Sequence, residues 1–412
     1  MVGRDRPILV AWEQGGNLGH LLRIKAIVEL MQRQRREVIL AVSQVLGSQF
    51  SQELEGIPCV KVVISETGRA KDEAQWAPVA SFAGVLARQG WSDANWLHRS
   101  TKAWMDLCLV TKPVAIVLDY APVASLVACI LRIAALQVSS GFDAPPAASL
   151  GIGRFRSRTG DISLAEVAEV SAVDASIARV ISTRGVEGPA PRLRQVLAHP
   201  IRLLDCIAQT DPYGAREDAN YVPFLSTPSH TEPAVWPGEQ SGLQNAKAFV
   251  YIRNNDVAEH VLQALSRKGV PTLCFWPGYE STMHFKCGDT VDVHAQPLDV
   301  HAVLLKASLV VSYGSVGVST RAVLAGVPQI VLPPDAEKGM VAKRLHEQRL
   351  GIYLDMKHAS SGIDRALDQI IGTDLYLDAC KKAQRKLQSE QAGRSFGGEV
   401  DRAIEQLIGT RP

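Results

Sequence analysis

The feature that most constrains the fold of this chain is an alternation of short apolar runs and amphipathic segments. The run PILVAW (7–12) leads into a glycine-rich loop, then a segment with helical spacing of apolar residues, then a second run, EVILAVS (37–43). Short, continuously apolar runs are typical of parallel strands buried on both faces. A strand, glycine loop, helix and strand in this order predict the opening of a doubly wound α/β sheet.

The same alternation begins again in the second half of the chain. It starts at KAFVYI (247–252) and continues through SLVVSY (308–313), with helical segments between the apolar runs. The 412 residues are enough for two domains of roughly 100–200 residues each. We therefore predict an α/β fold of two Rossmann-like, doubly wound domains facing a cleft.

A proline-rich segment without helical or strand periodicity separates the two alternations. It predicts an N-terminal domain over 1–225, a linker over 226–242 and a C-terminal domain over 243–385. A last helix, over 386–412, is expected to pack back on the N-terminal domain. Within the first domain we also expect a helix over 191–210.

The composition is that of a globular protein and argues against several other classes. The chain has 44 basic and 42 acidic residues, a net charge of +2, whereas general nucleic-acid binders carry a basic excess or stripe. The seven cysteines are scattered, without CxxC spacing, so we expect no zinc site and reduced thiols in a cytoplasmic protein. No apolar run reaches the ~18 residues of a transmembrane helix.

Two polar residues are expected at the ligand edge of the first sheet. His20 ends the loop GGNLGH and begins the helix after the first strand, and Asp119 ends the buried run VAIVLD. A neutral imidazole there can accept a proton from a hydroxyl group, and the carboxylate can orient it through a hydrogen bond. The residues alone also allow a packing histidine and an aspartate that caps the next helix.

A third loop, Tyr313-Gly314-Ser315-Val316-Gly317, joins a strand to a helix in the second half. The free amides and the dipole of a helix N-terminus attract anions such as a pyrophosphate. Small residues allow close approach, and serine hydroxyls can donate hydrogen bonds. An ordinary glycine turn is the alternative.

Together these loops resemble those of the inverting family-one glycosyltransferases, which have the GT-B fold. GGNLGH is similar to the family's loop with the catalytic histidine, and VLDYAPVASLVA to the strand whose aspartate partners it. Residues 312–351 resemble the family's donor motif, which reads HGGxGTxxEAxxxGVP, then LP, then DQxxNA, then G. The most specific part of the match in this chain is AGVPQIVLP. The resemblance covers roughly residues 7–380.

The donor motif of this chain departs from the family pattern at several positions. Tyr313 stands where the motif has histidine, and Arg321 where it has the glutamate that holds the ribose. Arginine has only donors and cannot accept the ribose hydroxyl protons. Glu337 and Lys338 replace the Asp-Gln pair that binds sugar hydroxyls, and Arg253 offers positive charge after the strand 247–252.

The resemblance implies a metal-independent transfer of a hexosyl group from a nucleoside-diphosphate sugar to a hydroxyl, with inversion. His20 would be the base and Asp119 its partner, with no cofactor and a UDP-sugar favoured over a dTDP-sugar as donor. The C-terminal domain would bind the donor and the N-terminal domain the acceptor. The residues expected at the donor are Gly16, Gly19, Arg253, Tyr313, Gly314, Ser315, Gly317, Ser319, Arg321, Glu337 and Lys338.

The acceptor is expected to contact the tryptophan-rich stretch 76–104 and the loop GFDAPP. Trp76, Trp91, Phe142 and Asp143 are the candidates, because aromatic rings stack on sugars and on other rings. Packing between helices is the alternative role for the tryptophans. The acceptor classes left open are a small aromatic compound, a lipid-linked saccharide and a polysaccharide, with or without peripheral membrane contact.

Two other functions fit the same fold. A non-hydrolysing sugar-nucleotide epimerase would use acids and a histidine of the C-terminal half, for which Asp335, Glu337 and His346 are present. A catalytically silent nucleotide-sugar-binding or partner protein would explain the altered donor motif. Retained His20 and Asp119 favour the transferase.

Overall fold

The computed structural model describes residues 6–63, 79–146, 153–155, 161–185, 188–217, 219–225, 234–237, 246–253, 255–279 and 288–409. The chain divides into two compact units. The first comprises Met1–Asp205, Arg216–Leu225 and Arg394–Pro412, and the second Cys206–Ala215 and Ser226–Gly393. Most of the predicted linker, 226–242, lies outside the described residues.

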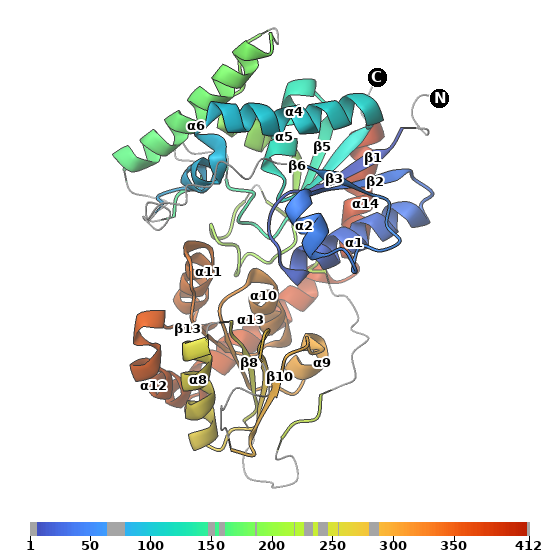
Figure 1. Cartoon of the computed structure of the whole chain (residues 1–412). Coiled ribbons are helices and arrows are strands. Elements are labelled where there is room, and N and C mark those ends of the chain that lie inside the picture. Colours follow the sequence, from blue (N-terminus) through green and yellow to red (C-terminus); the bar gives the residue numbers. More distant parts are fainter. Residues whose placement is uncertain are drawn as a thin grey trace. The chain divides into compact units, whose positions relative to one another are not determined.

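In the described part of the first unit, seven parallel strands form one sheet in the order β3-β2-β1-β4-β5-β6-β7 (Figure 1). They are β1 (Ile8–Trp12), β2 (Val38–Ser43), β3 (Cys59–Val62), β4 (Ala115–Asp119), β5 (Ala134–Ser139), β6 (Ile201–Leu204) and β7 (Asn220–Tyr221). The chain builds outward from β1 on one side and then, from β4, on the other. Ligands of doubly wound sheets bind where the strand order reverses in this way, at the carboxyl ends.

Helices cover both faces of this sheet. They are α1 (Leu18–Arg33), α2 (Gln44–Gln49), α3 (Phe82–Leu86), a π-helical turn (Ala87–Trp91), α4 (Ala94–Thr111), α5 (Pro122–Leu131), α6 (Leu164–Thr183), α7 (Leu193–Ala198) and α14 (Phe396–Gly409). The predicted helix over 191–210 is wrong in its extent, because only Leu193–Ala198 is helical. Helix α7 ends before Pro200, which cannot continue a helix without losing a backbone hydrogen bond, and the next residues form β6 beside β5.

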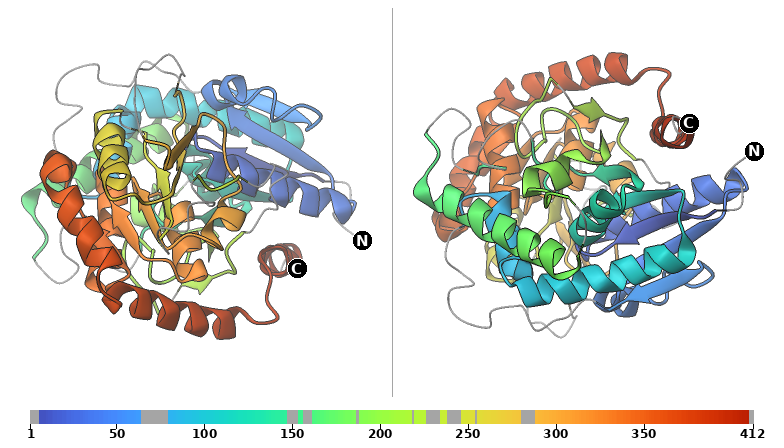
Figure 2. Two further views of the ribbon diagram at one scale, coloured as in Figure 1. Left: turned by 90° about the horizontal axis from the view of Figure 1, so that it is seen from below. Right: turned by 90° about the horizontal axis from the view of Figure 1, so that it is seen from above.

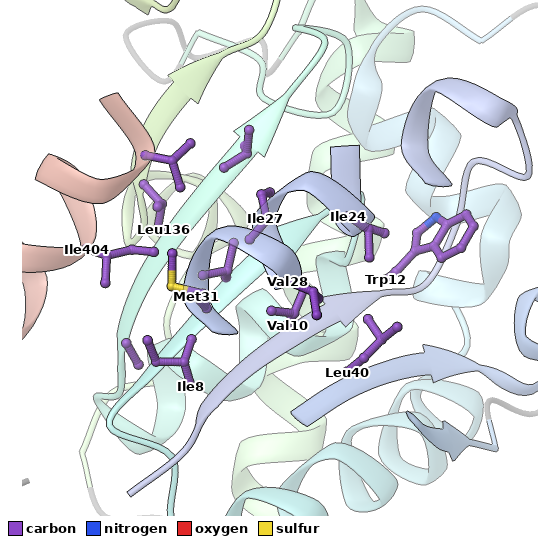
Figure 3. Packing of buried hydrophobic residues seen from close by; sticks show 14 of the residues in the cluster. Ile8, Val10, Trp12, Ile24, Ile27, Val28, Met31, Leu40, Leu136 and Ile404 are labelled. Atoms are coloured by element: carbon purple, nitrogen blue, oxygen red, sulfur yellow. The ribbon is translucent and has the colours of Figure 1, made fainter. Parts of the chain in front are cut away.

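Helices α1 and α14 pack on one face of the first sheet (Figure 3). Side chains of a strand alternate between faces, so Ile8, Val10 and Trp12 point to this face together. They meet residues of α1 at i, i+3, i+4 and i+7 spacing, which places all four on one side of the helix; these are Ile24, Ile27, Val28 and Met31. Burying each such aliphatic side chain contributes about 1.5–3 kcal/mol. The packing holds the start of α1, with His20, at the carboxyl end of β1.

In the described part of the second unit, six parallel strands form a sheet in the order β10-β9-β8-β11-β12-β13. They are β8 (Ala248–Tyr251), β9 (Thr272–Phe275), β10 (Val291–His294), β11 (Leu309–Ser312), β12 (Gln329–Val331) and β13 (Gly351–Tyr353). Here the order reverses between β8 and β11. The second unit therefore repeats the doubly wound topology of the first.

The helices of the second unit are α8 (Asn255–Arg267), α9 (Val300–Leu304), α10 (Val316–Ala325), α11 (Ala336–Glu347), a 3-10 turn (Met356–His358), α12 (Ala359–Ile371) and α13 (Leu375–Gln391). Helix α12 packs on α8, and α13 packs on α10 (Figure 2). No helix of the described residues is long and apolar enough to cross a membrane.

Candidate functional site

The reversal point of the first sheet brings His20 and Asp119 together. Strands β1 and β4 are neighbours with Trp12 opposite Asp119, so the loop after β1 and the end of β4 meet at one edge. The Nδ1 atom of His20 lies 2.6 Å from Oδ1 of Asp119. The aspartate is 1% exposed and the histidine side chain 12% exposed. The hydrogen bond expected from the sequence is therefore present, and it leaves Nε2 as the second ring nitrogen for chemistry.

Gly15 lets the imidazole of His20 lie directly against the backbone of the loop. A Cβ atom at this position would lie over the face of the ring, 2.3 Å from Nε2, 2.7 Å from Cδ2 and 2.8 Å from Cε1, and the backbone φ of +81° is one that glycine adopts readily. Any side chain at position 15 would therefore collide with the imidazole and displace it. Sequence analysis named the neighbouring glycines of this loop and missed the role of Gly15.

A pocket of about 270 Å³, counted with its open mouth, lies in the first unit. Its apolar wall comes from Phe82, Leu118, Pro122 and Leu197, and its polar atoms include those of Tyr120, Gln137 and Asp143. The ring of Tyr120 is centred 6.2 Å from that of His20. This volume includes space open to solvent, and the part that the centre of a water molecule can reach is only about 10 Å³, so the pocket has room for about one water molecule.

Asp143 is the predicted acceptor residue that reaches this pocket. It follows β5, is 4% exposed and accepts hydrogen bonds from Ser139 and from Gln137 (Nε2–Oδ2 3.0 Å). Burial raises its pKa, and the charge of Asp119 raises it further, against the lowering effects of the Ser139 hydroxyl and of His20. The pocket therefore has a buried carboxyl group that is harder to ionise than a free aspartate.

The other acceptor candidates are placed differently. Phe142 is 6% exposed and lies edge-on to Phe82, with ring centroids 5.7 Å apart, behind the pocket wall. Trp91 is fully buried in the π-helical turn, as expected for the packing role left open above. Trp76 lies outside the described residues.

A set of polar contacts holds the loops after β1 and β4 to each other. Both carboxylate oxygens of Glu13 accept hydrogen bonds from the first amides of α5, Val123 N at 3.0 Å and Ala124 N at 2.6 Å. Gln14 Nε2 donates to Oε1 of Gln89 at 2.9 Å. Burial raises the pKa of Glu13 to about 8, although its two amide donors act in the other direction. These residues fix the loops that carry His20 and Asp119.

Arg23 and Asp205 also belong to this edge, and sequence analysis missed both. The Nε atom of Arg23 lies 3.1 Å from Oδ2 of Asp119 and 3.8 Å from Oδ2 of Asp205. All three side chains are almost completely buried. The aspartate beside the histidine is thus shared with a guanidinium group.

In the second unit, the loop after β11 forms a tight turn into α10. Gly314 has φ of +86°, and a Cβ there would lie 2.6 Å from Cγ1 of Val331, so only glycine fits. Ser315 is the N-cap of α10 and accepts a hydrogen bond from Val318 N at 3.4 Å. The remaining amides of the first turn and the helix dipole provide the electropositive end that binds anions.

Arg253 extends from the end of β8, next to this turn. Its Nη2 donates to the hydroxyl of Tyr251 at 3.2 Å, and its Cζ lies 5.6 Å from the centroid of the Tyr313 ring. Burial raises the pKa of Tyr313, and the neighbouring Tyr251 adds to the effect, so the phenol stays neutral. Tyr313 is therefore a support for the guanidinium and not an anionic group.

Glu337 and Lys338 lie at the N-terminus of α11, after β12. The ammonium group of Lys338 is 2.7 Å from Oε2 of Glu337 and 3.2 Å from Oδ2 of Asp335. Burial lowers the pKa of Lys338, but the two carboxylates outweigh it and raise the pKa overall. The carbonyl of Lys338 would lie 3.4 Å from a Cβ of Gly314, so this trio borders the turn before α10.

The remaining predicted donor residues occupy varied positions. The carbonyl of Gly16 accepts from Gln49 Nε2 at 3.3 Å, and Gly19 is exposed at the start of α1. Gly317 and Arg321 lie in α10, partly buried. Ser319 is fully buried, and its carbonyl accepts from Gln329 Nε2 at 3.1 Å. Among the described residues, no group of three or more His, Cys, Asp or Glu side chains could hold a metal ion.

Comparison with known sequences finds similarity in the second half of the chain. Residues 288–407 match the family of erythromycin biosynthesis protein CIII-like proteins, C-terminal domain. The NDP-glycosyltransferase YjiC of Bacillus subtilis is 28% identical over 100 residues, which are 24% of this chain and 26% of that protein. The match thus spans about a quarter of the curated relative.

Comparison with solved structures finds similarity over almost the whole chain. The calicheamicin glycosyltransferase CalG4 has a TM-score of 0.72 at 18% identity, covering 99% of each chain. The spinosyn rhamnosyltransferase SpnG, complexed with thymidine diphosphate, has a TM-score of 0.65 at 14% identity, covering 97% of this chain and 100% of that one. At such identities the likeness shows the GT-B fold. With the sequence matches, it confirms the predicted resemblance of this chain to the family-one glycosyltransferases.

Proposed function

We propose that this protein is a glycosyltransferase that moves a sugar from a nucleoside-diphosphate sugar to an acceptor hydroxyl. The observation that carries the proposal is the 2.6 Å contact between His20 Nδ1 and buried Asp119, with Gly15 letting the imidazole lie against the backbone. A carboxylate that accepts a hydrogen bond from Nδ1–H leaves the lone pair on Nε2, which makes that atom a general base.

In the proposed reaction, Nε2 of His20 removes the proton of an acceptor hydroxyl. The hydroxyl oxygen attacks the anomeric carbon of the donor sugar, and the bond from that carbon to the diphosphate oxygen breaks. Asp119 stabilises the imidazolium that forms. A single displacement of this kind inverts the configuration at the anomeric carbon. The nucleoside diphosphate leaves with the bonding electron pair, and its developing charge needs positive groups.

We place the diphosphate at the turn of Gly314 and Ser315 before α10, with Arg253 beside it. Helix amides, the helix dipole and a guanidinium group supply the positive potential that a divalent ion supplies in other enzymes. We therefore infer a metal-independent reaction, which a chelator leaves unchanged. Glu337 offers a carboxylate for sugar hydroxyls. The sequence favours UDP, whereas SpnG and VinC are described in complex with thymidine diphosphate.

The acceptor, in this proposal, lies beside Tyr120 in the first unit, over the mouth of the narrow pocket. The apolar walls and few polar groups there suit a small, partly aromatic molecule with a hydroxyl group. SpnG has also been described in complex with an aglycone, the spinosyn aglycone. A small acceptor is therefore favoured over a polysaccharide or a lipid-linked saccharide, and we expect the reaction in the cytoplasm.

Calorimetric titration of the purified protein with UDP, dTDP and GDP tests the donor half of the proposal. Tight binding of one nucleotide that weakens on the order of 10–10²-fold in Arg253→Ala would support the site before α10 and identify the donor class. Binding of one nucleotide without transfer to any acceptor would favour a silent partner protein. The absence of binding by all three nucleotides would contradict the proposal.

A further inference from the structure

The carboxyl edge of the first sheet gathers ionisable side chains from several neighbouring elements around one guanidinium group. Helix α1 contributes His20 and Arg23, Asp119 ends β4, Asp143 follows β5 and Asp205 follows β6. The side chains of Arg23, Asp119 and Asp205 are 3%, 1% and 6% exposed. Burying so many charges is costly unless each has a partner. Their arrangement therefore needs a physical reason.

Asp119 has a different partner on each of its two oxygens. Oδ1 is bonded to His20 Nδ1 at 2.6 Å, and Oδ2 lies 3.1 Å from Arg23 Nε. Contacts on both oxygens fix the rotation of a carboxylate, which a single contact does not. Guanidinium stays protonated at all accessible pH values, so Arg23 keeps its positive charge beside Asp119.

Asp205 holds Arg23 from the other side. Its Oδ2 lies 3.8 Å from Arg23 Nε, and its Oδ1 accepts a hydrogen bond from Leu225 N at 2.9 Å. The guanidinium is thus placed between the ends of β4 and β6. Its position is set by the backbone of two strands and not by the flexible arginine side chain alone.

The cluster places charges of both signs around His20. Asp119 and Asp205 carry carboxylates and Arg23 a guanidinium, so an imidazolium at His20 would have attractive and repulsive neighbours. Burial raises the pKa of Asp143, and the charge of Asp119 raises it further, so its ionised form is disfavoured relative to a free aspartate. Tyr120 lies beside His20, and Glu13 is bonded to the amides of α5. Removing Arg23 or Asp205 would therefore change the electrostatic environment of the imidazole in opposite directions.

We propose that Arg23 is a positioning residue for the base: held by Asp205, it fixes Asp119 in the orientation that directs Nε2 of His20 toward the acceptor. The inference rests on the proposed role of His20 as base. Arg23 touches neither substrate in this account and acts only through Asp119.

The titration of His20 tests this coupling without any need for activity. Isotope-labelled protein would be titrated by NMR, with the His20 signal among the ten histidines assigned by its loss in His20→Gln. Removing the cation in Arg23→Met should move the His20 midpoint to higher pH, since the imidazolium loses a repulsive neighbour. Removing an anion in Asp205→Asn should move it to lower pH. Midpoints that stay unchanged in both variants would overturn the proposal.

The transfer rate distinguishes orientation from charge alone. The double variant Arg23→Met/Asp205→Asn leaves no unpaired charge at position 205, so it should fold even if Arg23→Met does not. The His20 midpoint of the double variant should return toward that of the wild type. Its kcat should stay lower than that of the wild type on the order of 10–10²-fold, because Asp119 is no longer oriented. Its KM for the donor should stay within about threefold of the wild-type value. A wild-type kcat in this variant would overturn the positioning role.

Two further variants serve as controls for this experiment. Arg184→Met removes a partly buried arginine of the first unit, which donates to the His98 carbonyl at 2.7 Å. It should change stability and neither the His20 midpoint nor KM and kcat. Arg23→Lys should recover part of the rate, because an ammonium keeps the charge without the planar geometry. If the wild type showed no transfer with any donor, the proposed function would fail, while the opposite midpoint shifts would still decide the coupling of Arg23 to His20.

Discussion

The two sheets of this protein have the same doubly wound topology, yet their reversal points present different chemistry. Between β1 and β4, the carboxyl edge holds a buried acid–base pair, His20 and Asp119. Between β8 and β11, it holds a glycine turn, a helix N-terminus and a guanidinium supported by tyrosine rings. Topology decides where functional side chains gather, and the residues at those positions decide whether the edge moves protons or binds an anion.

Removing the imidazole of His20 distinguishes the roles of the two carboxyl edges most sharply. His20→Ala should lower kcat on the order of 10²–10⁴-fold, as expected for a general base, while calorimetric affinity for the nucleotide stays unchanged. His260→Ala, which alters an exposed histidine on α8, is the control and should keep the full rate. Equal losses in rate and nucleotide affinity would mean that the division of roles is wrong.

Gly15→Ala should displace the imidazole of the base from its position. The added methyl would lie 2.3 Å from Nε2, so we expect a loss in kcat of about 10²-fold and a loss of about 1–2 kcal/mol in unfolding free energy from the positive φ. Gly56→Ala is the matched control, because Gly56 also has φ of +81° and open space around its Cβ. Both variants should lose stability in thermal unfolding, and only Gly15→Ala should lose activity.

Arg253→Ala tests the other edge. Hydrogen bonds to charged groups contribute about 1.5–3 kcal/mol, so affinity for the nucleoside diphosphate should fall on the order of 10–10²-fold in calorimetry. Arg267→Ala, at the end of α8 where Arg267 pairs with Asp364 at 2.9 Å, should bind like the wild type. A wild-type affinity in Arg253→Ala would remove this residue from the diphosphate site.

The smallest expected effect concerns Glu13, whose pKa is raised to about 8 by burial. Between the ordinary pKa near 4.5 and about 8, the unfolded chain loses this proton and the folded protein keeps it, so stability falls as pH rises through that window. In urea unfolding, the wild type should lose at least ~1 kcal/mol more than Glu13→Gln between pH 5 and pH 8. Parallel pH profiles would show that Glu13 is ionised in the folded protein.

The elements that sequence analysis predicted well are those with long, continuous apolar runs. Strands β1, β2, β4, β8 and β11 follow from such runs, and the glycine loops between strand and helix locate both carboxyl edges. Strand β6 was missed because its run, Ile201–Leu204, is short and follows directly on α7. The edge strands β7 and β13 are too short to have a period at all.

The candidate site was predictable where a local pattern carried it. His20 and Asp119 each follow a buried strand, and the pairing of β1 with β4 brings them together. Arg23 has the sequence context of a solvent-facing helical residue, and Asp205 lies far from it along the chain. Only the arrangement of β4, β5 and β6 in space shows that they share one cluster. The role of Gly15 could also not be predicted from the sequence, because it depends on the orientation of the imidazole ring of His20.

The most direct test of the proposed function is a transfer assay that follows the acceptor and the donor at the same time. The protein would be incubated with UDP-, dTDP- and GDP-sugars and a panel of small hydroxylated aromatic acceptors, and mass spectrometry would follow the acceptor and the released nucleotide. The account predicts one added sugar per acceptor, with inverted anomeric configuration by NMR, equal release of nucleoside diphosphate, and loss of both in His20→Ala. Transfer that persists undiminished in His20→Ala would contradict it.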